Sequence, residues 1–493
     1  LIFMLNNSAD KENNTAGVIN PAGSTRFFSH STRLFSHYIP TEYFLLAVIE
    51  FFVLMAAYYV GIDLRFNENV WENRLGDFFV HALVFTVVMQ ISLVAFGAYQ
   101  RQHDEPGAMI AARVGASMML GMLLLSLAFY VIPEFMLGRG AFALAVFVSF
   151  VFIMMVRLVF RRISNAYDLR TRILVLGAGN TANLIKVAES NDELHGINFV
   201  GFMPMPGDRD TDSRISMAKT PGAMVKYVAE NNIDVIVLAM DERREGLPVH
   251  ELLDCKMGGV EVLDLLTFFE RYTSKIRLDI MQPSWLFLSE GFEINDFRRM
   301  WKRLFDIVCV LVLAPVVLPV AVLASIAILI ESRGREGVIY SQTRVSENGR
   351  HFQIYKFRSM VMEAEKDGVA RWAAKNDARI TRVGSVLRKF RIDELPQLFN
   401  VLRGDMSFVG PRPERPEFVE KLSENIPYYN ERHRVKPGLS GWAQIRYPYG
   451  ASEEDGFEKL QYDLYYVKNC SILLDMLVIL QTAEVVLLGK GAQ

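Results

Sequence analysis

An adjacent pair of acidic residues beside a basic stretch is the strongest candidate for chemistry in this 493-residue sequence. Residues 344–391 hold twelve Lys and Arg against five Asp and Glu, and Asp393 and Glu394 follow directly. Asp393 is a favourable residue for a helix N-cap, and Pro396 is tolerated in the first turn of a helix, so both acids are expected at a helix N-terminus. The free backbone N–H groups of a helix N-terminus attract phosphate. One carboxylate there could attack phosphorus to give an acyl phosphate, while the other could help to hold Mg²⁺. An ordinary helix cap and a patch for anionic lipid head groups are the alternatives.

The elements that must position this pair begin with a membrane block. Hydrophobic residues make up 51% of the chain and charged residues 22%, with a mean hydropathy of +0.19. This composition argues against disorder and against a wholly soluble protein. Residues 1–40 are polar and are predicted to form a tail. Residues 41–165 are predicted to form a bundle of four transmembrane helices, because four apolar segments there can each cross about 30 Å of hydrocarbon: 43–62, 78–99, 114–132 and 141–159.

Composition also excludes several classes of protein. The three cysteines form no C-x-x-C pair, which argues against a disulfide scaffold and against a cysteine-built metal site. A net charge of −2 gives no general case for nucleic acid as a partner. No secretory signal is recognisable before the first apolar segment. Glu50, His81 and Gln90 are the few polar residues of the bundle, and with no expected pairing among them we predict no function there.

Charged residues indicate the orientation of the bundle. Arg157, Arg161 and Arg162 end the fourth segment and place this end in the cytoplasm, which puts the N-terminal side of the four crossings there too. Arg65 and Arg74 lie on the first outer loop, so the preference of positive charges for the cytoplasmic side is imperfect in this sequence.

A fifth apolar run, residues 307–330, has no charge and has basic residues on both flanks. Positive charge at both ends predicts that both ends stay in the cytoplasm. Pro315 and Pro319 should break the helix, because proline lacks an N–H and clashes with the carbonyl four residues earlier. We therefore predict a re-entrant membrane helix over residues 306–331 that dips into one leaflet and returns. A kinked fifth span is the alternative.

Residues 170–290 show the alternation of strands and helices typical of a parallel, doubly wound sheet. A buried strand at residues 173–176 is followed by Gly177, Gly179 and Ala182 in a GxGxxA pattern, which predicts a Rossmann-like, nucleotide- or CoA-binding-like domain with both glycines near a pyrophosphate. The second strand, however, does not end in the acidic residue that a dinucleotide ribose requires. The alternative is that the glycines only make a tight turn in a scaffold or dimerisation domain.

A membrane-anchored, NAD-dependent sugar-nucleotide dehydratase is a rival hypothesis, since such enzymes also join four spans to a nucleotide-binding fold. Their chemistry requires a Tyr-x-x-x-Lys pair in which the lysine lowers the tyrosine pKa. None of the 18 tyrosines has a lysine four residues later. A non-catalytic membrane scaffold is the other alternative.

Five motifs in the last 200 residues resemble one known family. They are, in order, KRLFD at 302–306, YKFRSM at 355–360, DELPQ at 393–397, GDMSFVGPRP at 404–413 and KPGLSGW at 436–442. Residues 295–493 thereby resemble the bacterial sugar transferases, or monotopic phosphoglycosyl transferases. With four spans and the middle domain in front, the chain resembles the large polyprenyl-phosphate hexose-1-phosphate transferases.

The resemblance implies an α/β monotopic catalytic domain with a re-entrant helix, on the cytoplasmic face of the bacterial inner (cytoplasmic) membrane. It implies transfer of a sugar 1-phosphate from a UDP-sugar to undecaprenyl phosphate with release of UMP, which begins exopolysaccharide or O-antigen synthesis. Asp393 would form a covalent phospho-sugar intermediate, and Glu394, with Asp393, would bind Mg²⁺. The expected partners are these two substrates, membrane lipid and a second copy of the chain in a homodimer.

The resemblance also implies ligands for the substrate phosphates or the UMP end: Lys356, Arg358, Arg388 and Arg412. Arg412 lies between two prolines that stiffen its backbone, which could present a bidentate fork to phosphate. A salt bridge that closes a turn is the alternative for Arg412. Small members of the family place a serine before the proline of the re-entrant helix, whereas Ala314 and Leu318 precede the prolines here.

Overall fold

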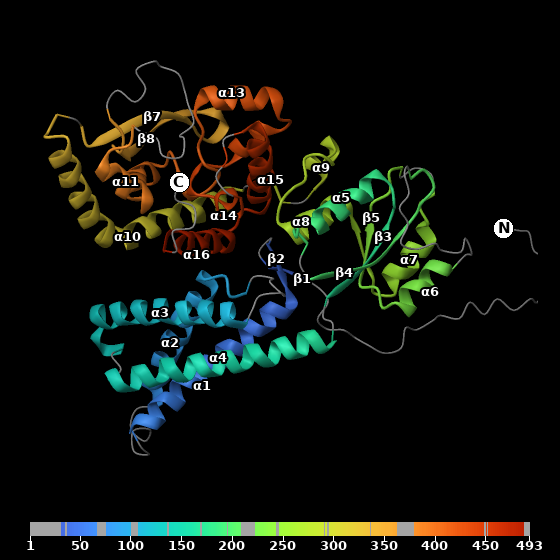
Figure 1. Ribbon diagram of the computed structural model, residues 1–493, viewed down its shortest axis with the longest axis horizontal. Coiled ribbons are helices and arrows are strands. Elements are labelled where there is room, and N and C mark those ends of the chain that lie inside the picture. The colour runs from blue at the N-terminus through green and yellow to red at the C-terminus, as the bar shows by residue number, and fades with distance from the viewer. Residues whose placement is uncertain are drawn as a thin grey trace, which may run out of the picture. The chain divides into compact units, whose positions relative to one another are not determined.

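Figure 1 shows the computed structural model of the protein. It describes residues 31–34, 37–66, 75–99, 107–135, 138–167, 170–194, 196–208, 222–242, 246–289, 291–292, 295–335, 337–361, 379–447, 450 and 452–487. Most of the predicted polar tail lies outside these residues. Its last part forms an antiparallel hairpin of β1 (Ser31–Leu34) and β2 (His37–Pro40).

Four apolar helices form in the region predicted for the bundle, as fits a membrane protein. They are α1 (Thr41–Phe66), α2 (Leu75–Ala95), α3 (Gly107–Val131) and α4 (Arg139–Tyr167), with a short 3₁₀ turn η1 (Pro133–Phe135) before α4. α1, α3 and α4 are long and apolar enough to span a membrane, and α2 is apolar over Phe79–Ala95. Leu54, Tyr58, Phe85 and Met89 pack in the bundle core, while Phe52 and Leu123 are exposed, as lipid-facing residues would be.

The expectation that nothing pairs the polar residues of the bundle is wrong. Glu50 on α1 is fully buried and forms an ion pair with Arg157 on α4, with Nε to Oε1 at 2.8 Å. Tyr99 donates a hydrogen bond to Glu50, and Gln90 donates one to the Tyr99 hydroxyl at 2.7 Å. His81 contacts the carbonyl of residue 134. The pairing joins three helices because an unpaired charge is costly in a membrane.

The middle domain contains the predicted alternation of strands and helices. Its elements are β3 (Thr171–Leu176), α5 (Asn180–Ser190), β4 (Ile197–Met203), α6 (Ala223–Glu230), β5 (Val235–Leu238), α7 (Val249–Met257) and β6 (Glu261–Asp264). The strand order is β4-β3-β5-β6, and β3 is parallel to both of its neighbours. The last four residues of β3, from Ile173 to Leu176, are apolar and fully buried because helices cover both faces of such a sheet.

This compact unit ends at Leu263, whereas the sequence predicts a middle domain up to residue 290. The next helices, α8 (Leu265–Thr273) and α9 (Pro283–Leu288), belong to the unit that contains the C-terminal part. Glu270 on α8 is buried in an ion pair with Lys468, with Oε2 to Nζ at 2.6 Å. The indole of Trp442 donates to the carbonyl of Ser274 at 3.0 Å.

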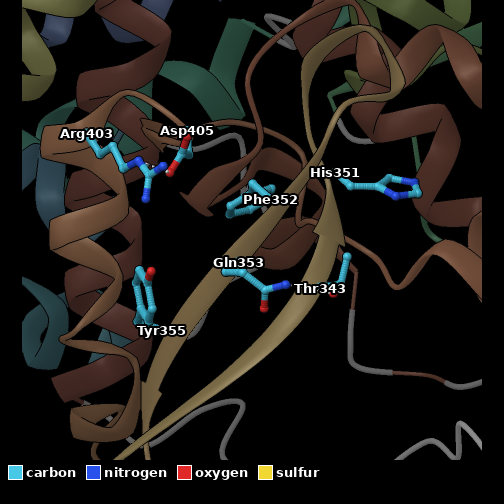
Figure 2. A pocket seen from close by; sticks show the side chains of 7 residues that line it. All are labelled: Thr343, His351, Phe352, Gln353, Tyr355, Arg403 and Asp405. Atoms are coloured by element: carbon cyan, nitrogen blue, oxygen red, sulfur yellow. Dashed lines mark hydrogen bonds and ion pairs between the residues drawn. The ribbon is translucent and has the colours of Figure 1, made fainter.

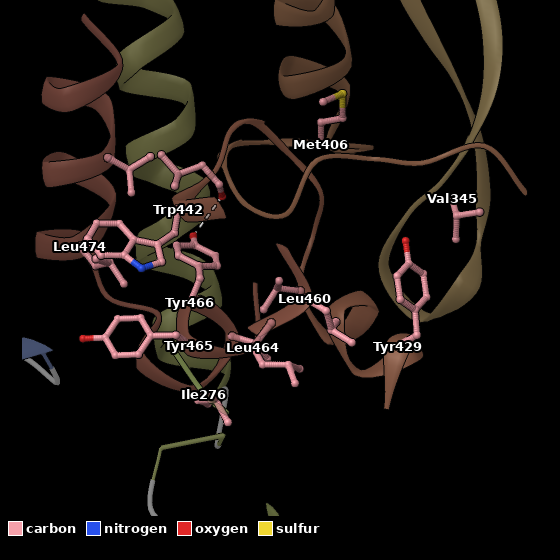
Figure 3. Packing of buried hydrophobic residues seen from close by; sticks show 14 of the residues in the cluster. Ile276, Val345, Met406, Tyr429, Trp442, Leu460, Leu464, Tyr465, Tyr466 and Leu474 are labelled. Carbon is pink, nitrogen blue, oxygen red and sulfur yellow. Dashed lines mark hydrogen bonds between the residues drawn. The ribbon is translucent and has the colours of Figure 1, made fainter. Parts of the chain in front are cut away.

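The C-terminal part is a mixed α/β domain. Its elements are α10 (Asp296–Glu331), β7 (Ile339–Val345), η2 (Glu347–Gly349), β8 (His351–Phe357), α11 (Arg382–Lys389), η3 (Ile392–Glu394), α12 (Gln397–Arg403), β9 (Ser407–Val409), α13 (Pro416–Asn425), η4 (Tyr429–Arg434), β10 (Gly438–Ser440), α14 (Trp442–Arg446), α15 (Glu453–Asn469) and α16 (Ile472–Leu487). β7 and β8 form an antiparallel hairpin, and β9 pairs in parallel with β10. Figure 3 shows the aromatic core, in which Trp442 stacks on Tyr465.

The prediction that Pro315 and Pro319 divide the apolar run into two helices is wrong. α10 is one helix of 36 residues that continues through both prolines. Figure 1 shows that it changes direction along its course rather than running straight. A proline removes one hydrogen bond and can kink a helix without ending it.

Both ends of α10 contact the C-terminal domain. Lys302 near the start donates to the carbonyl of Val409 at 3.0 Å, and Ile328 near the end packs with Phe357 and Leu387. A straight helix of this length would extend about 54 Å at about 1.5 Å per residue, so the bend returns the chain to the domain. Apolar side chains between the two ends, such as Leu311 and Leu323, are exposed.

Candidate active site

The two candidate carboxylates lie on η3, a single 3₁₀ turn between α11 and α12. The prediction that Asp393 is a helix N-cap is wrong: Arg391 holds that position before η3, and Pro396 holds it before α12. Arg391 has a φ of 56°, a left-handed conformation that is unfavourable by about 1 kcal/mol for a residue with a side chain. This turn places Asp393 and Glu394 inside the domain, where both are buried.

Close packing brings η3 to the β7–β8 hairpin. Gly384 on α11 lies against the backbone of Ser359, just after β8, and a Cβ at Gly384 would collide with the Ser359 carbonyl. Asn400 on α12 is fully buried, accepts from Tyr355 N at 3.1 Å and donates to Gln353 O at 2.7 Å. These bonds hold the strand next to the carboxylates.

Three cations from three segments converge on Glu394. Its Oε1 lies 3.0 Å from Arg412 Nη2, 3.2 Å from Lys356 Nζ and 3.6 Å from Arg391 Nη1. The sequence predicts Lys356 and Arg412 as site residues, and the structure brings both to the pair. The salt bridge weighed as an alternative for Arg412 is present. Arg391 is missing from the predicted ligands, although its position three residues before Glu394 could have indicated it.

The surroundings give the two carboxylates opposite titration behaviour. Burial, with the adjacent charge of Glu394, raises the pKa of Asp393 above its usual range. Burial alone would raise the pKa of Glu394 too, but Lys356, Arg412 and Arg391 together hold it well below its usual range. Burial, helped by Arg412, lowers the pKa of Lys356 although Glu394 acts in the other direction. Glu394 is therefore a fixed anion, and Asp393 is the more basic carboxylate of the pair.

Asp393 has an open coordination position. Its Oδ1 is buried and accepts no hydrogen bond within the described part of the chain. Buried polar atoms are normally paired, so an orphaned carboxylate oxygen fits a ligand or a cation. No group of three or more His, Cys, Asp and Glu that could hold a metal lies among the described residues. The pair nevertheless fits Mg²⁺, which usually takes one or two carboxylates and completes its shell with substrate phosphates and water.

The other two predicted ligands differ in their placement. Arg388 on α11 lies close enough to Asp393 to lower the pKa of that carboxyl. Arg358 follows β8, where its backbone N–H donates to Val338 O at 2.9 Å and its guanidinium lies near Gly337. Arg358 is not among the cations that pair with Glu394 in the described residues.

A separate hollow of about 270 Å³ lies on the β7–β8 hairpin (Figure 2). Gln353, Tyr355 and Arg403 are among its lining residues. Successive side chains of a strand point to opposite faces, so Tyr355 and its neighbour Lys356 face opposite ways. Neither Lys356 nor Glu394 is among the residues that line the hollow.

The glycine-rich turn of the middle domain has a structural reason for its first glycine. Gly177 has a φ of 125°, and a Cβ there would collide with the carbonyl of Ala239 at the end of β5. Gly179 lies just before α5, and its carbonyl accepts from Asn183 N at 3.0 Å.

Two aspartates occupy the N–H groups that a pyrophosphate would use at this turn. Asp208 accepts from Ala178 N at 2.9 Å, and Asp241 accepts from Asn180 N at 3.1 Å and Thr181 N at 2.7 Å. Carboxylates at this place repel a phosphate. The arrangement favours the alternative in which the glycines make a tight turn.

The α/β domain of this membrane protein holds two buried carboxylates among cations. Such a site is typical of an enzyme that acts on phosphate groups. Comparison with known proteins gives the family. Residues 297–489 match the bacterial sugar transferase family, and residues 94–254 match a CoA-binding domain family. The chain is 34% identical over 330 residues to UDP-glucose:undecaprenyl-phosphate glucose-1-phosphate transferase of Escherichia coli, covering 65% of this chain and 68% of the relative. The chain belongs to the bacterial sugar transferase family.

Two further relatives are matched over shorter shares of their length. The chain is 40% identical over 242 residues (49% of the chain) to UDP-N-acetylgalactosamine-undecaprenyl-phosphate N-acetylgalactosaminephosphotransferase of Aeromonas hydrophila. It is 30% identical over 333 residues (66% of the chain) to undecaprenyl-phosphate glucose phosphotransferase of Komagataeibacter xylinus. The chain spans 56% and 60% of these two relatives.

Proposed function

We propose that the protein transfers a sugar 1-phosphate from a UDP-sugar to undecaprenyl phosphate and releases UMP. Its site would lie at the cytoplasmic face of the bacterial inner membrane. The relatives, whose names specify this class of reaction, support the proposal. The observation that carries it is the buried Asp393, one oxygen of which has no partner among the described residues, beside a Glu394 that three cations hold ionised.

The first step would form a covalent intermediate on Asp393. A carboxylate oxygen of Asp393 attacks the sugar-bearing phosphorus of the donor, and the bond from this phosphorus to the bridging oxygen breaks. UMP leaves with the electron pair, and the sugar phosphate remains on Asp393 as an acyl phosphate. The raised pKa of Asp393 makes this carboxylate a better nucleophile than its neighbour. Lys356 and Arg412 would bind the departing phosphate.

The second step would regenerate the enzyme. An oxygen of undecaprenyl phosphate attacks the phosphorus, the bond between Asp393 and phosphorus breaks, and the undecaprenyl diphosphate sugar leaves. Asp393 and Glu394 would hold Mg²⁺, which when bound neutralises charge on the diphosphate. No further group is needed to balance the reaction.

The apolar stretch of α10 would bring the site to the lipid substrate. Its two ends contact the same domain, residues 307–330 carry no charge, and apolar side chains among them, such as Leu311 and Leu323, are exposed. A helix that dips into one leaflet and returns explains both features. The homodimer remains a prediction from the resemblance.

UMP release with a panel of UDP-sugars and undecaprenyl phosphate tests this function. We expect release with at least one donor, dependence on Mg²⁺, and its loss in Asp393→Asn, which keeps the size of the side chain but not its nucleophilicity. Glu424→Gln, at an exposed carboxylate on α13 of the same domain, is a control that should retain activity. Turnover retained in Asp393→Asn would eliminate the nucleophile. Bound NAD(H) in the purified protein would support the dehydratase instead.

A further inference from the structure

The segment that carries Arg412 has its backbone fixed at four successive carbonyls. Pro411 O accepts from Gly438 N at 2.9 Å, and Glu414 O accepts from Val345 N at 3.0 Å. The two carbonyls between them accept from side chains: Arg412 O from Arg432 Nη2 at 3.0 Å and Pro413 O from Arg344 Nη1 at 3.3 Å. The prolines have no N–H to donate, so these acceptor bonds determine where the segment lies.

Arg432 is an unusual donor for a backbone carbonyl because it is itself buried. Its Nη2 is 2.7 Å from Asp463 on α15, which is also buried, and its Nη1 donates to the Tyr429 hydroxyl at 2.7 Å. Tyr429 belongs to the packed cluster that Figure 3 shows, together with Val345. Desolvation largely offsets what a buried ion pair contributes to stability, so the pair is better explained by the geometry that it imposes.

That geometry ends at the carboxylate pair. The Arg412 guanidinium lies 3.0 Å from Glu394 Oε1, next to the Lys356 ammonium group, which pairs with the same oxygen. A shift of the Arg412 backbone by about 1 Å would break the hydrogen bond between Arg412 and Glu394. Such a shift far from the reacting atoms can lower turnover by up to about 100-fold.

We propose that Arg432 is a positioning residue for the transferase reaction: anchored on Asp463, it holds the backbone of Arg412 so that the Arg412 guanidinium meets Glu394 and the donor phosphate. This inference rests on the proposed function. Arg432 acts through Arg412 and does not touch the substrate.

The test compares conservative variants of the full-length protein in detergent. Arg432→Lys keeps the charge beside Asp463 but cannot donate to Asp463, Tyr429 and the Arg412 carbonyl together. Arg434→Lys is the matched control, because Arg434 lies on the same η4 turn, is exposed and, among the described residues, forms its ion pair with nearby Glu431 at 2.9 Å. The measurement is kcat/KM for the UDP-sugar from UMP release, with thermal unfolding as a check of folding.

We expect Arg432→Lys to lower kcat/KM by about tenfold or more and Arg434→Lys to change it by less than about twofold. In an Arg412→Lys background, Arg432→Lys should lower kcat/KM by less than about threefold further, because the guanidinium that Arg432 positions is already absent. Equal activity of the two single variants would overturn the inference. So would a full tenfold loss repeated in the Arg412→Lys background, which would mean a merely structural role.

If Arg432→Lys is not recovered folded, Asp463→Asn makes the same test with a side chain of nearly the same shape. It should lower kcat/KM by about threefold or more, and the loss should again disappear in the Arg412→Lys background. An unchanged kcat/KM, or a loss that persists in that background, overturns the inference. A wild-type protein that releases no UMP from any donor overturns the proposed function itself, and this inference with it.

Discussion

Lys356→Met tests the electrostatic design of the carboxylate pair. Lys356 Nζ is 3.2 Å from Glu394 Oε1, so their direct attraction is about 5 kcal/mol at an effective dielectric constant of about 20. Burial of the ammonium group opposes this attraction and outweighs it, since the pKa of Lys356 is lowered. Arg412 and Arg391 still pair with Glu394 in the variant, so the free energy of unfolding should change by about 1 kcal/mol or less. Methionine keeps most of the length of the side chain and removes its charge and its hydrogen-bond donors.

The expected loss is in catalysis. Removing a cation aimed at the phosphate should lower kcat/KM about 100-fold, which corresponds to about 2.7 kcal/mol. Lys356 also lowers the pKa of Asp393, which must be ionised to attack. Its removal should therefore move the acidic limb of the pH profile of kcat/KM to higher pH.

UMP release at saturating undecaprenyl phosphate, over roughly pH 5 to 9, measures both effects. Lys389→Met is the matched control, because Lys389 is an exposed lysine on α11 that pairs with neither carboxylate. Its kcat/KM and pH profile should match those of the wild type. A Lys356→Met protein within about twofold of wild type, with an unmoved acidic limb, would refute the reasoning.

Two further predictions concern stability. Asn400→Ala removes a fully buried amide and leaves Gln353 O and Tyr355 N without these partners, so it should lower the free energy of unfolding by about 2 to 4 kcal/mol in denaturant titration. A loss no larger than that of exposed Asn425→Ala would contradict this. Burial and Arg432 lower the pKa of His433 to about 3. The unfolded chain binds a proton at His433 below about pH 6.5 that the folded chain does not, so the folded state should lose up to about 2 kcal/mol between about pH 7 and pH 5. His433→Gln should lose correspondingly less in thermal unfolding, and equal losses would contradict the assignment.

The sequence predicts features that depend on local pattern. Four apolar segments of spanning length predicted α1 to α4, and alternating short apolar runs predicted the strands of the middle domain. The adjacency of Asp393 and Glu394, with basic residues nearby, indicated a phosphate site. These features are visible because hydrophobic periodicity and neighbouring charges need no tertiary information.

Features that depend on distant contacts could not be predicted. Glu50 and Arg157 are 107 residues apart, and only packing of α1 against α4 shows that they pair. The grouping of Lys356, Arg391 and Arg412 around Glu394 joins three separate segments. Arg391 has a left-handed backbone that is unusual for arginine, so its nearness to Glu394 in the sequence, and not its residue type, was the available signal.

The central claim is that Asp393 becomes esterified to the sugar phosphate. Mass spectrometry of protein quenched during incubation with the UDP-sugar alone tests it most directly, with Asp393→Asn as the control. We expect a mass increase of one sugar phosphate on the peptide that contains Asp393 and none in the control. An active wild-type protein that never carries this adduct, or carries it on another residue, would rule out Asp393 as the nucleophile.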